Sequence, residues 1–158
     1  MKYRLNIVKT YLLDKSFEES FSKLQDIVGA SFYDSKYSLF GNYFLTEPPD
    51  FILMAKWASI GRPVLSNVFS TKISAKLYKL DNKTKIILET STNPIFFVFL
   101  GVCIISVFVQ LIKYQGPNDL KMIVGYLLGA IFILVLDRFV KNIVIASFEE
   151  DTKIRVPG

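Results

Sequence analysis

Histidine is absent from this chain of 158 residues, and cysteine occurs once. Without histidine the chain lacks the side chain that most often exchanges protons near neutral pH and most often binds metals. Its one cysteine, Cys103, has no second thiol with which to form a disulfide or hold a metal. No G-x-G-x-x-G loop and no G-x-x-x-x-G-K-[ST] loop occurs. We therefore predict a protein that is not an enzyme, with no catalytic residue, no cofactor and no metal site.

Clustered charge of one sign is also missing. The 19 Lys and Arg residues against 14 Asp and Glu give a net charge of +5, and the basic residues are dispersed along the chain. A nucleic-acid-binding surface normally concentrates Lys and Arg on one face beside a recognisable binding motif. We therefore expect no nucleic-acid partner, and attraction to anionic lipid headgroups fits this charge better.

Two long apolar runs are present near the C-terminal end. Residues 95–112 contain no charged side chain, and residues 122–136 form a second run after a short polar, turn-prone connection. Such composition is typical of helices that cross a bilayer. The second run would span only about 22 Å of a hydrocarbon core about 30 Å thick, so we expect Lys121 and Arg138 to extend it by reaching the headgroups. The sequence thus predicts a transmembrane helical hairpin over residues 94–140.

The first 93 residues predict a soluble α+β domain of about five mostly antiparallel strands and one helix. Alternating apolar residues indicate a strand over residues 2–9. Ser16 and Glu19 then form the S-x-x-E pattern that caps a helix, and Gly29 is a natural place for this helix to end.

Further strands are expected after this helix. Residues 31–44 are rich in aromatic side chains, and Gly41-Asn42 suggests a bulge or tight turn within them. A strand over residues 51–57 should follow the turn at Pro48-Pro49, and residues 71–90 read as a hairpin with its turn at Asp81-Asn82. The tail, residues 141–158, is expected to form either an interfacial helix or an added strand.

Small residues in the apolar runs predict close helix packing. Gly125 and Gly129 form a G-x-x-x-G pattern that Ala130 continues, and such a pattern lets another helix approach closely. We expect these residues to pack against Gly101 of the first apolar run. Homodimerisation or contact with another membrane subunit is the alternative.

Basic side chains beside the apolar runs predict contact with lipid headgroups. Alternation places Lys72 and Lys76 on the outward face of the hairpin, where a solvated edge that discourages aggregation is the alternative interpretation. Asp137 and Arg138 are expected to form a local ion pair. The candidate headgroup contacts are Lys72, Lys76, Lys79, Lys83, Lys85, Arg138 and Lys141.

Charge also predicts orientation. Lys113 and Lys121 flank the connection between the apolar runs, whereas eight Lys and Arg residues lie on the side of the domain. We therefore expect a cell-membrane protein with two membrane helices and with both termini cytoplasmic.

The chain also resembles a loose group of small uncharacterised bacterial membrane proteins, in which a sheet domain precedes a two-helix membrane hairpin. The matching elements are F-G-N at residues 40–42, G-R-P at 61–63, K-T-K-I at 83–86 and T-N-P at 92–94. The resemblance implies this architecture and no particular activity.

These observations favour a non-catalytic integral membrane protein that acts as an accessory, assembly or scaffold subunit, with membrane lipids and a protein partner or a second copy as its partners. One alternative is that the domain binds a lipid or another amphiphile in an apolar cavity, with Trp57 and the Tyr residues near its mouth. A third is that the hairpin oligomerises through Gly125 and Gly129 into a pore or a defence effector.

Overall fold

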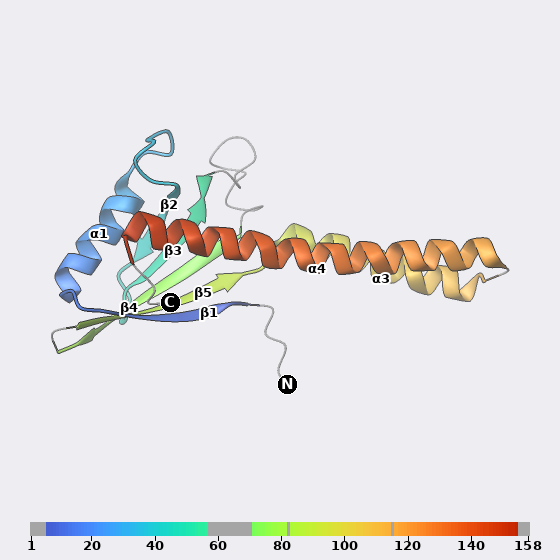
Figure 1. The fold of residues 1–158 in the computed structure, drawn as a ribbon, viewed down its shortest axis with the longest axis horizontal. Helices are drawn as coiled ribbons and strands as arrows, with labels where there is room; N and C mark the ends of the chain where they lie inside the picture. The colour runs from blue at the N-terminus through green and yellow to red at the C-terminus, as the bar shows by residue number, and fades with distance from the viewer. Residues whose placement is uncertain (1–5, 57–70, 82, 115, 155–158) are drawn as a thin grey trace.

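The computed structural model describes residues 6–56, 71–81, 83–114 and 116–154 (Figure 1). A five-stranded antiparallel sheet forms the domain, and two long apolar helices extend from one end of it. This confirms the predicted α+β domain followed by a helical hairpin. The elements are β1 (Val8–Leu13), α1 (Phe17–Gly29), β2 (Leu39–Phe44), β3 (Asp50–Ala55), β4 (Lys72–Leu80), β5 (Lys83–Ser91), α3 (Pro94–Ile112) and α4 (Pro117–Thr152).

The sheet has the strand order β1-β5-β4-β3-β2, so the first and last strands of the chain lie side by side. Tyr11 pairs with Ile86 in the β1–β5 register. Side chains alternate as expected for a sheet with one face in the core, since Ile73, Ala75 and Leu77 are buried whereas the residues between them are partly exposed. The β4–β5 hairpin confirms the prediction over residues 71–90.

Helix α1 begins and ends where the sequence predicted. The Ser16 hydroxyl oxygen accepts a hydrogen bond of 3.1 Å from the backbone N–H of Glu19, and the helix ends at Gly29. Leu24 and Ile27 bury the apolar side of the helix against the sheet. The S-x-x-E pattern was therefore a reliable signal, because it satisfies backbone donors that no helical carbonyl can reach.

Three strand predictions need correction. The first strand is shifted, because β1 covers Val8–Leu13 instead of residues 2–9, of which 2–5 lie outside the described residues. Residues 31–38 form turns and β2 begins only at Leu39. The third strand, β3, ends at Ala55, and Trp57 lies outside the described residues.

Gly41 lies inside β2 and does not form a bulge or turn. It pairs with Leu53 of β3 in an unbroken register. A Cβ atom at this position would lie 1.9 Å from the carbonyl oxygen of Ile52. Glycine is therefore required here because the two backbones approach too closely for any side chain.

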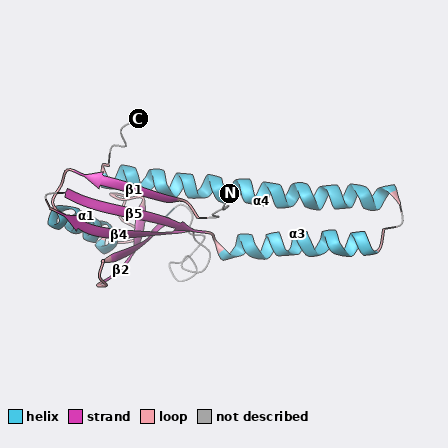
Figure 2. Ribbon diagram, turned by 90° about the horizontal axis from the view of Figure 1, so that it is seen from below, coloured by secondary structure: helices cyan, strands magenta, loops and turns pink. Residues whose placement is uncertain are grey.

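Helix α4 runs unbroken for 36 residues, or about 54 Å. Its first half packs along α3, and its second half lies across the sheet (Figure 2). Of the alternatives for the tail, residues 141–152 continue α4 and form no strand, whereas residues 155–158 lie outside the described residues. The second apolar helix is also longer than the predicted 15-residue run, because it begins at Pro117 and does not end at Leu136.

The core of the domain combines β1 with the last part of α4. Val144 and Phe148 of α4 are fully buried and join one hydrophobic cluster with Tyr11, Leu39 and Leu88. The sequence-based division into residues 1–93, 94–140 and 141–158 therefore separates groups that fold together. Among the described residues, the domain consists of 6–56, 71–81 and 83–91 with the last part of α4, and the hairpin is an insertion between β5 and that last part.

Candidate functional site

A buried ion pair lies where the hairpin meets the domain. The ammonium nitrogen of Lys141 lies 2.6 Å from Oδ2 of Asp137, one helical turn earlier, and 2.5 Å from the hydroxyl oxygen of Thr92, which precedes α3. Lys141 is 0% exposed and Asp137 is 5% exposed. Asp137 Oδ1 has no hydrogen-bond partner among the described residues. These contacts join α4 to the start of α3.

This geometry corrects two predictions. Lys141 is buried and therefore does not contact lipid headgroups. Asp137 pairs with Lys141 and not with Arg138, which is exposed on the other side of the helix. The i,i+4 spacing explains the choice, since residues four apart lie on the same helix face whereas adjacent residues do not.

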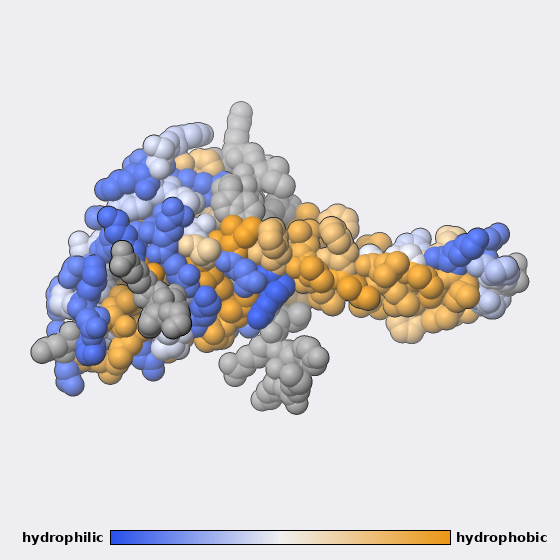
Figure 3. Space-filling view, viewed as in Figure 1, coloured by the Kyte–Doolittle hydropathy of each residue, from blue (hydrophilic) through white to orange (hydrophobic). Residues whose placement is uncertain are grey.

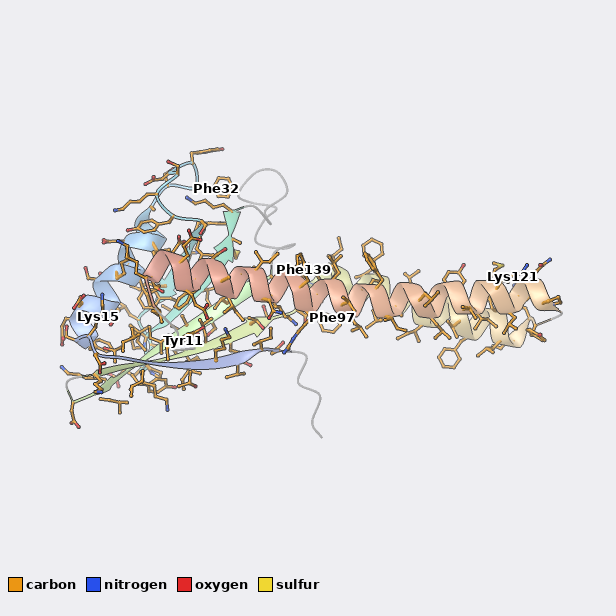
Figure 4. All side chains as sticks on the ribbon, in the orientation of Figure 1. Tyr11, Lys15, Phe32, Phe97, Lys121 and Phe139 are labelled. Atoms are coloured by element: carbon orange, nitrogen blue, oxygen red, sulfur yellow. The ribbon has the colours of Figure 1, made fainter. Side chains whose placement is uncertain are left out.

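Two carboxylates near the end of α4 bind opposite edges of the sheet. Glu149 Oε1 accepts hydrogen bonds from the Tyr11 hydroxyl at 2.6 Å and from the Lys9 ammonium at 2.9 Å, both on edge strand β1. The Asp151 carboxylate accepts from the backbone N–H and hydroxyl of Ser38 and from the backbone N–H of Leu39, where the other edge strand, β2, begins. Figure 4 places Tyr11 below this part of α4. The end of α4 is therefore fixed across the width of the sheet.

The contact between Tyr11 and Glu149 shifts both pKa values. Burial raises the pKa of the Tyr11 hydroxyl well above its usual value of 10.0, and the neighbouring Glu149 carboxylate raises it further. Burial also raises the pKa of Glu149, but the hydrogen bonds from Tyr11 and Lys9 outweigh this effect and leave the pKa below its usual value of 4.5. The folded state thus favours a neutral tyrosine beside an ionised glutamate.

These shifts predict how stability depends on pH. Glu149 binds its proton less readily when folded, so its contribution is present above pH 4.5 and is lost as the pH falls through the lower folded value. Tyr11 releases its proton less readily when folded, so its contribution is present below pH 10 and is lost at higher pH. We expect Tyr11→Phe to lower the free energy of unfolding by about 1–2 kcal/mol at pH 7, and by less as the pH falls below 4.5 and Glu149 takes up its proton, when measured by urea titration.

The control for this experiment is Tyr33→Phe, which removes the hydroxyl of a tyrosine that is 83% exposed. It should change the free energy of unfolding by less than about 0.5 kcal/mol at either pH. An equal cost of Tyr11→Phe at pH 7 and pH 3.5 would contradict the assigned role of the ionised Glu149.

The lysines of the β4–β5 hairpin divide into two groups. Lys72, Lys76 and Lys85 lie on the outward face of the sheet and form no ion pair with another described residue. Lys79 and Lys83 lie at the tip of the hairpin, where they pair with Glu18 at 3.0 Å and with Asp14 at 2.7 Å. Strand β5 carries the chain from this tip to α3, so the tip lies about 30 Å from the start of the apolar hairpin.

The outward face of the sheet carries both amines and apolar groups. Helices α1 and α4 pack on the opposite face (Figure 2). Leu12 is paired with Lys85, Ile87 with Lys76, and Phe44 with Asp50 on this outward face. Val8, Leu12 and Phe44 are exposed. We call this surface the open sheet face; it runs alongside the long axis of the molecule.

The two apolar helices present hydrophobic side chains around most of their circumference. The apolar surface extends from the domain to a polar end near Lys121 (Figures 3 and 4). Helix α3 has 19 residues, and none of them is buried. Both α3 and α4 are long and apolar enough to cross a membrane.

Packing between α3 and α4 involves Gly129 rather than Gly125. A Cβ atom added at Gly129 would lie 3.7 Å from the sulfur of Cys103, and Ala130 is half-buried next to it. Added Cβ atoms at Gly125 and Gly101 would meet no atom within 4 Å. The expected contact between Gly101 and the G-x-x-x-G pattern is therefore absent, and Cys103 takes its place against Gly129.

Leucine substitutions should separate contacts within the hairpin from contacts between copies. Gly129→Leu is expected to push α3 away from α4 and to lower the thermal unfolding temperature in detergent. Gly125→Leu should leave that temperature nearly unchanged, because its side chain would point into open space. If chemical crosslinking shows that Gly125→Leu also abolishes an oligomer, the exposed glycine mediates assembly; equal destabilisation by both variants would contradict the assigned packing.

Comparisons with known proteins identify no relative. No family model matches the chain, and no curated protein matches it. Among the residues that the structure describes, no group of three or more His, Cys, Asp or Glu side chains could hold a metal ion. The class that the fold defines is an antiparallel α+β domain with two long apolar helices inserted before its last helical segment.

Proposed function

We propose that this chain is a non-catalytic integral membrane protein that acts as an accessory, assembly or scaffold subunit of a membrane complex. The observation that carries this proposal is the continuity of α4, which is at once a helix of the apolar hairpin and part of the core of the domain. A domain attached in this way has a fixed orientation relative to its membrane helices. Such rigidity suits a protein that holds a partner in place.

The dimensions of the hairpin support a transmembrane location. Helix α3 is about 28 Å long, close to the thickness of a bilayer core of about 30 Å. The apolar part of α4 ends at Asp137, where the first buried charges of the domain occur. Strand β1 and the end of α4 both lie on the domain side of the hairpin (Figure 1), and the positive-inside rule favours the cytoplasm for this side.

A cysteine at Gln115 tests this topology in a variant in which Cys103 is replaced by alanine. We expect a membrane-impermeant maleimide to label it from outside intact cells, whereas a cysteine at Ser22, on the exposed side of α1, should react only after lysis. Labelling of Ser22→Cys in intact cells would reverse the proposed orientation.

The open sheet face is the proposed contact surface for a partner. If α3 and α4 cross the bilayer, this face stands beside the membrane normal and not against the headgroups. A protein in the same membrane can therefore cover it more easily than lipid can. Lys72, Lys76 and Lys85 among apolar side chains favour a partner that presents carboxylates and apolar groups.

A photo-crosslinking amino acid at Ile87, on the open sheet face, tests this contact in native membranes. We expect a single crosslinked product whose amount stays in constant proportion to the amount of the protein. This product should disappear when the protein also carries Lys76→Glu. The same amino acid at Ser22, on the opposite layer of the domain, should give no such product. Native mass spectrometry of the extracted protein then reports the stoichiometry.

The results of these two measurements distinguish the functions considered. A stoichiometric foreign protein supports the accessory subunit. A lone monomer with one defined lipid would overturn it in favour of lipid binding. A homo-oligomer that releases a dye from vesicles would overturn it in favour of a pore.

A further inference from the structure

A cavity of about 260 Å³ lies at the end of the domain that is farthest from the hairpin loop. Its walls come from the end of β1, the first half of α1, Ile86 of β5 and the C-terminal end of α4. Lys15, which lines it, lies at the opposite end of the molecule from Lys121 (Figure 4). The cavity is therefore remote from any membrane that α3 and α4 would cross, and a lipid within that bilayer would not reach it.

Ser20 gives the wall of this cavity a hydroxyl group that forms no hydrogen bond with any described residue. The residue is 5% exposed, lines the cavity, and its hydroxyl oxygen has no hydrogen-bond partner among the described residues. A buried hydroxyl without a partner costs about 1–3 kcal/mol, and alanine at the same place in α1 would avoid this cost. A hydrogen-bonding group supplied by a ligand would remove the penalty.

The deeper wall beside Ser20 is apolar. Leu24 and Ile86 are each 1% exposed, and both belong to the main hydrophobic core. Leu13 lines the cavity from the end of β1. A bound molecule would therefore place an apolar portion against these side chains and a polar portion beside the Ser20 hydroxyl.

The charges at the rim favour an anion as the polar portion. Of the carboxylates that line the cavity, Asp14 pairs with Lys83 at 2.7 Å and Glu19 with Lys15 at 2.9 Å. Lys23 and Lys153 also line it, and neither forms an ion pair with another described residue. The Lys23 ammonium lies 4.8 Å from the ring centre of Tyr37 and donates a hydrogen bond of 3.4 Å to its hydroxyl, so it keeps its charge unpaired by any described carboxylate. Two amines thus remain to balance the charge of a ligand.

From this geometry we propose that the cavity binds a small, soluble, amphipathic carboxylate such as a short-chain fatty acid. Its apolar chain packs against Leu24 and Ile86, and its carboxylate accepts a hydrogen bond from the Ser20 hydroxyl near the amines of Lys23 and Lys153. The cavity is smaller than the 300–1,000 Å³ that is usual for drug-sized ligands, which limits the ligand to roughly ten non-hydrogen atoms.

Ligand binding at this place would act on α4. Thr152 and Ile154 form part of the wall, and Asp151, which binds the start of β2, lies directly before them. A ligand that fills the cavity would therefore favour the docked position of the end of α4, by mass action. Because α4 continues into the hairpin, this is a route by which a soluble metabolite could stabilise the protein without touching the membrane.

Isothermal titration of the full-length protein in zwitterionic nanodiscs with hexanoate tests the proposal, and hexanol is the neutral probe. We expect saturable binding of hexanoate with an affinity about tenfold or more above that of hexanol. Ser20→Ala should weaken hexanoate binding about fivefold to tenfold, and Lys23→Gln with Lys153→Gln should abolish the preference for the anion. Ser22→Ala, on the exposed side of the same helix, should bind as the unchanged protein does.

Three results would overturn the proposal: no saturable binding up to about 10 mM hexanoate, equal affinity for hexanol, or equal weakening by Ser20→Ala and Ser22→Ala. Circular dichroism of each variant shows whether the domain is folded, and alanine at an interior helical position should not unfold it. The outcome is independent of the crosslinking at Ile87, which lies on the other face of the sheet. Failure here would leave the accessory-subunit proposal intact.

Discussion

Replacing Lys141 by alanine is expected to lower the free energy of unfolding by about 3–5 kcal/mol, because it leaves the carboxylate of Asp137 buried without its counter-charge. Both charges lie in the protein interior, so water cannot compensate for the missing partner. Chemical unfolding in detergent, followed by circular dichroism, measures the change.

The informative control replaces both members of the pair at once. Asp137→Leu combined with Lys141→Met should recover most of the stability, because apolar groups of similar volume carry no desolvation cost. Arg138→Ala removes an adjacent but exposed charge and should cost less than about 0.5 kcal/mol. A small effect of Lys141→Ala alone would show that the pair is accessible to solvent and would contradict the geometry.

The ion pair also explains why the second half of α4 was not foreseen. Asp137, Arg138 and Lys141 interrupt the apolar run, and a charged cluster at this place is typical of the end of a membrane helix. The spacing of Ile133, Asp137 and Val144 nevertheless continues one face of a single helix. That periodicity was visible in the sequence, but the burial of Lys141 depends on Thr92, which is 49 residues away.

Helix ends and turns were predictable where they depend on residues close together in the sequence. The cap at Ser16, the stop at Gly29, the turn after Leu80 and the start of α3 at Asn93-Pro94 were each read from adjacent side chains. The side chain of Asn93 accepts a hydrogen bond of 3.0 Å from the N–H of Ile95, as a helix-capping residue does. The predicted bulge or turn at Gly41 was wrong. Glycine is needed here because a side chain would clash with the backbone of Ile52 on the next strand, and no residue adjacent in the sequence indicates that clash.

The candidate headgroup contacts were likewise predictable only where they depend on residues close in the sequence. Alternation correctly placed Lys72 and Lys76 on the outward face, because period-two patterning is a property of the strand itself. Pairing of Lys79 with Glu18 and of Lys83 with Asp14 depends on where α1 begins relative to the β4–β5 hairpin. The cavity beside Ser20 depends on residues from four separate elements, and no sequence pattern in any one of them marks it.

Replacing Phe148 by alanine is expected to have the other large effect, because this side chain anchors the end of α4 in the core of the domain. Phe148 is 0% exposed and its ring centre lies 6.2 Å from that of Tyr11. Removing a fully buried phenylalanine costs about 3–5 kcal/mol, through lost apolar burial and the cavity that remains. Hydrogen exchange should report faster exchange in β1, whose Tyr11 ring lies against Phe148.

The matched control is Phe139→Ala, which makes the same change two and a half turns earlier in the same helix, where the side chain is 59% exposed. We expect Phe139→Ala to leave exchange in the sheet unchanged. Phe148→Ala should loosen the sheet while α3 and the first half of α4 remain helical in detergent, since their packing does not involve Phe148. If both halves of α4 instead unfold together, the helix transmits the loss of docking into the hairpin; if neither changes, the end of α4 is not part of the core and the domain needs only the residues before α3.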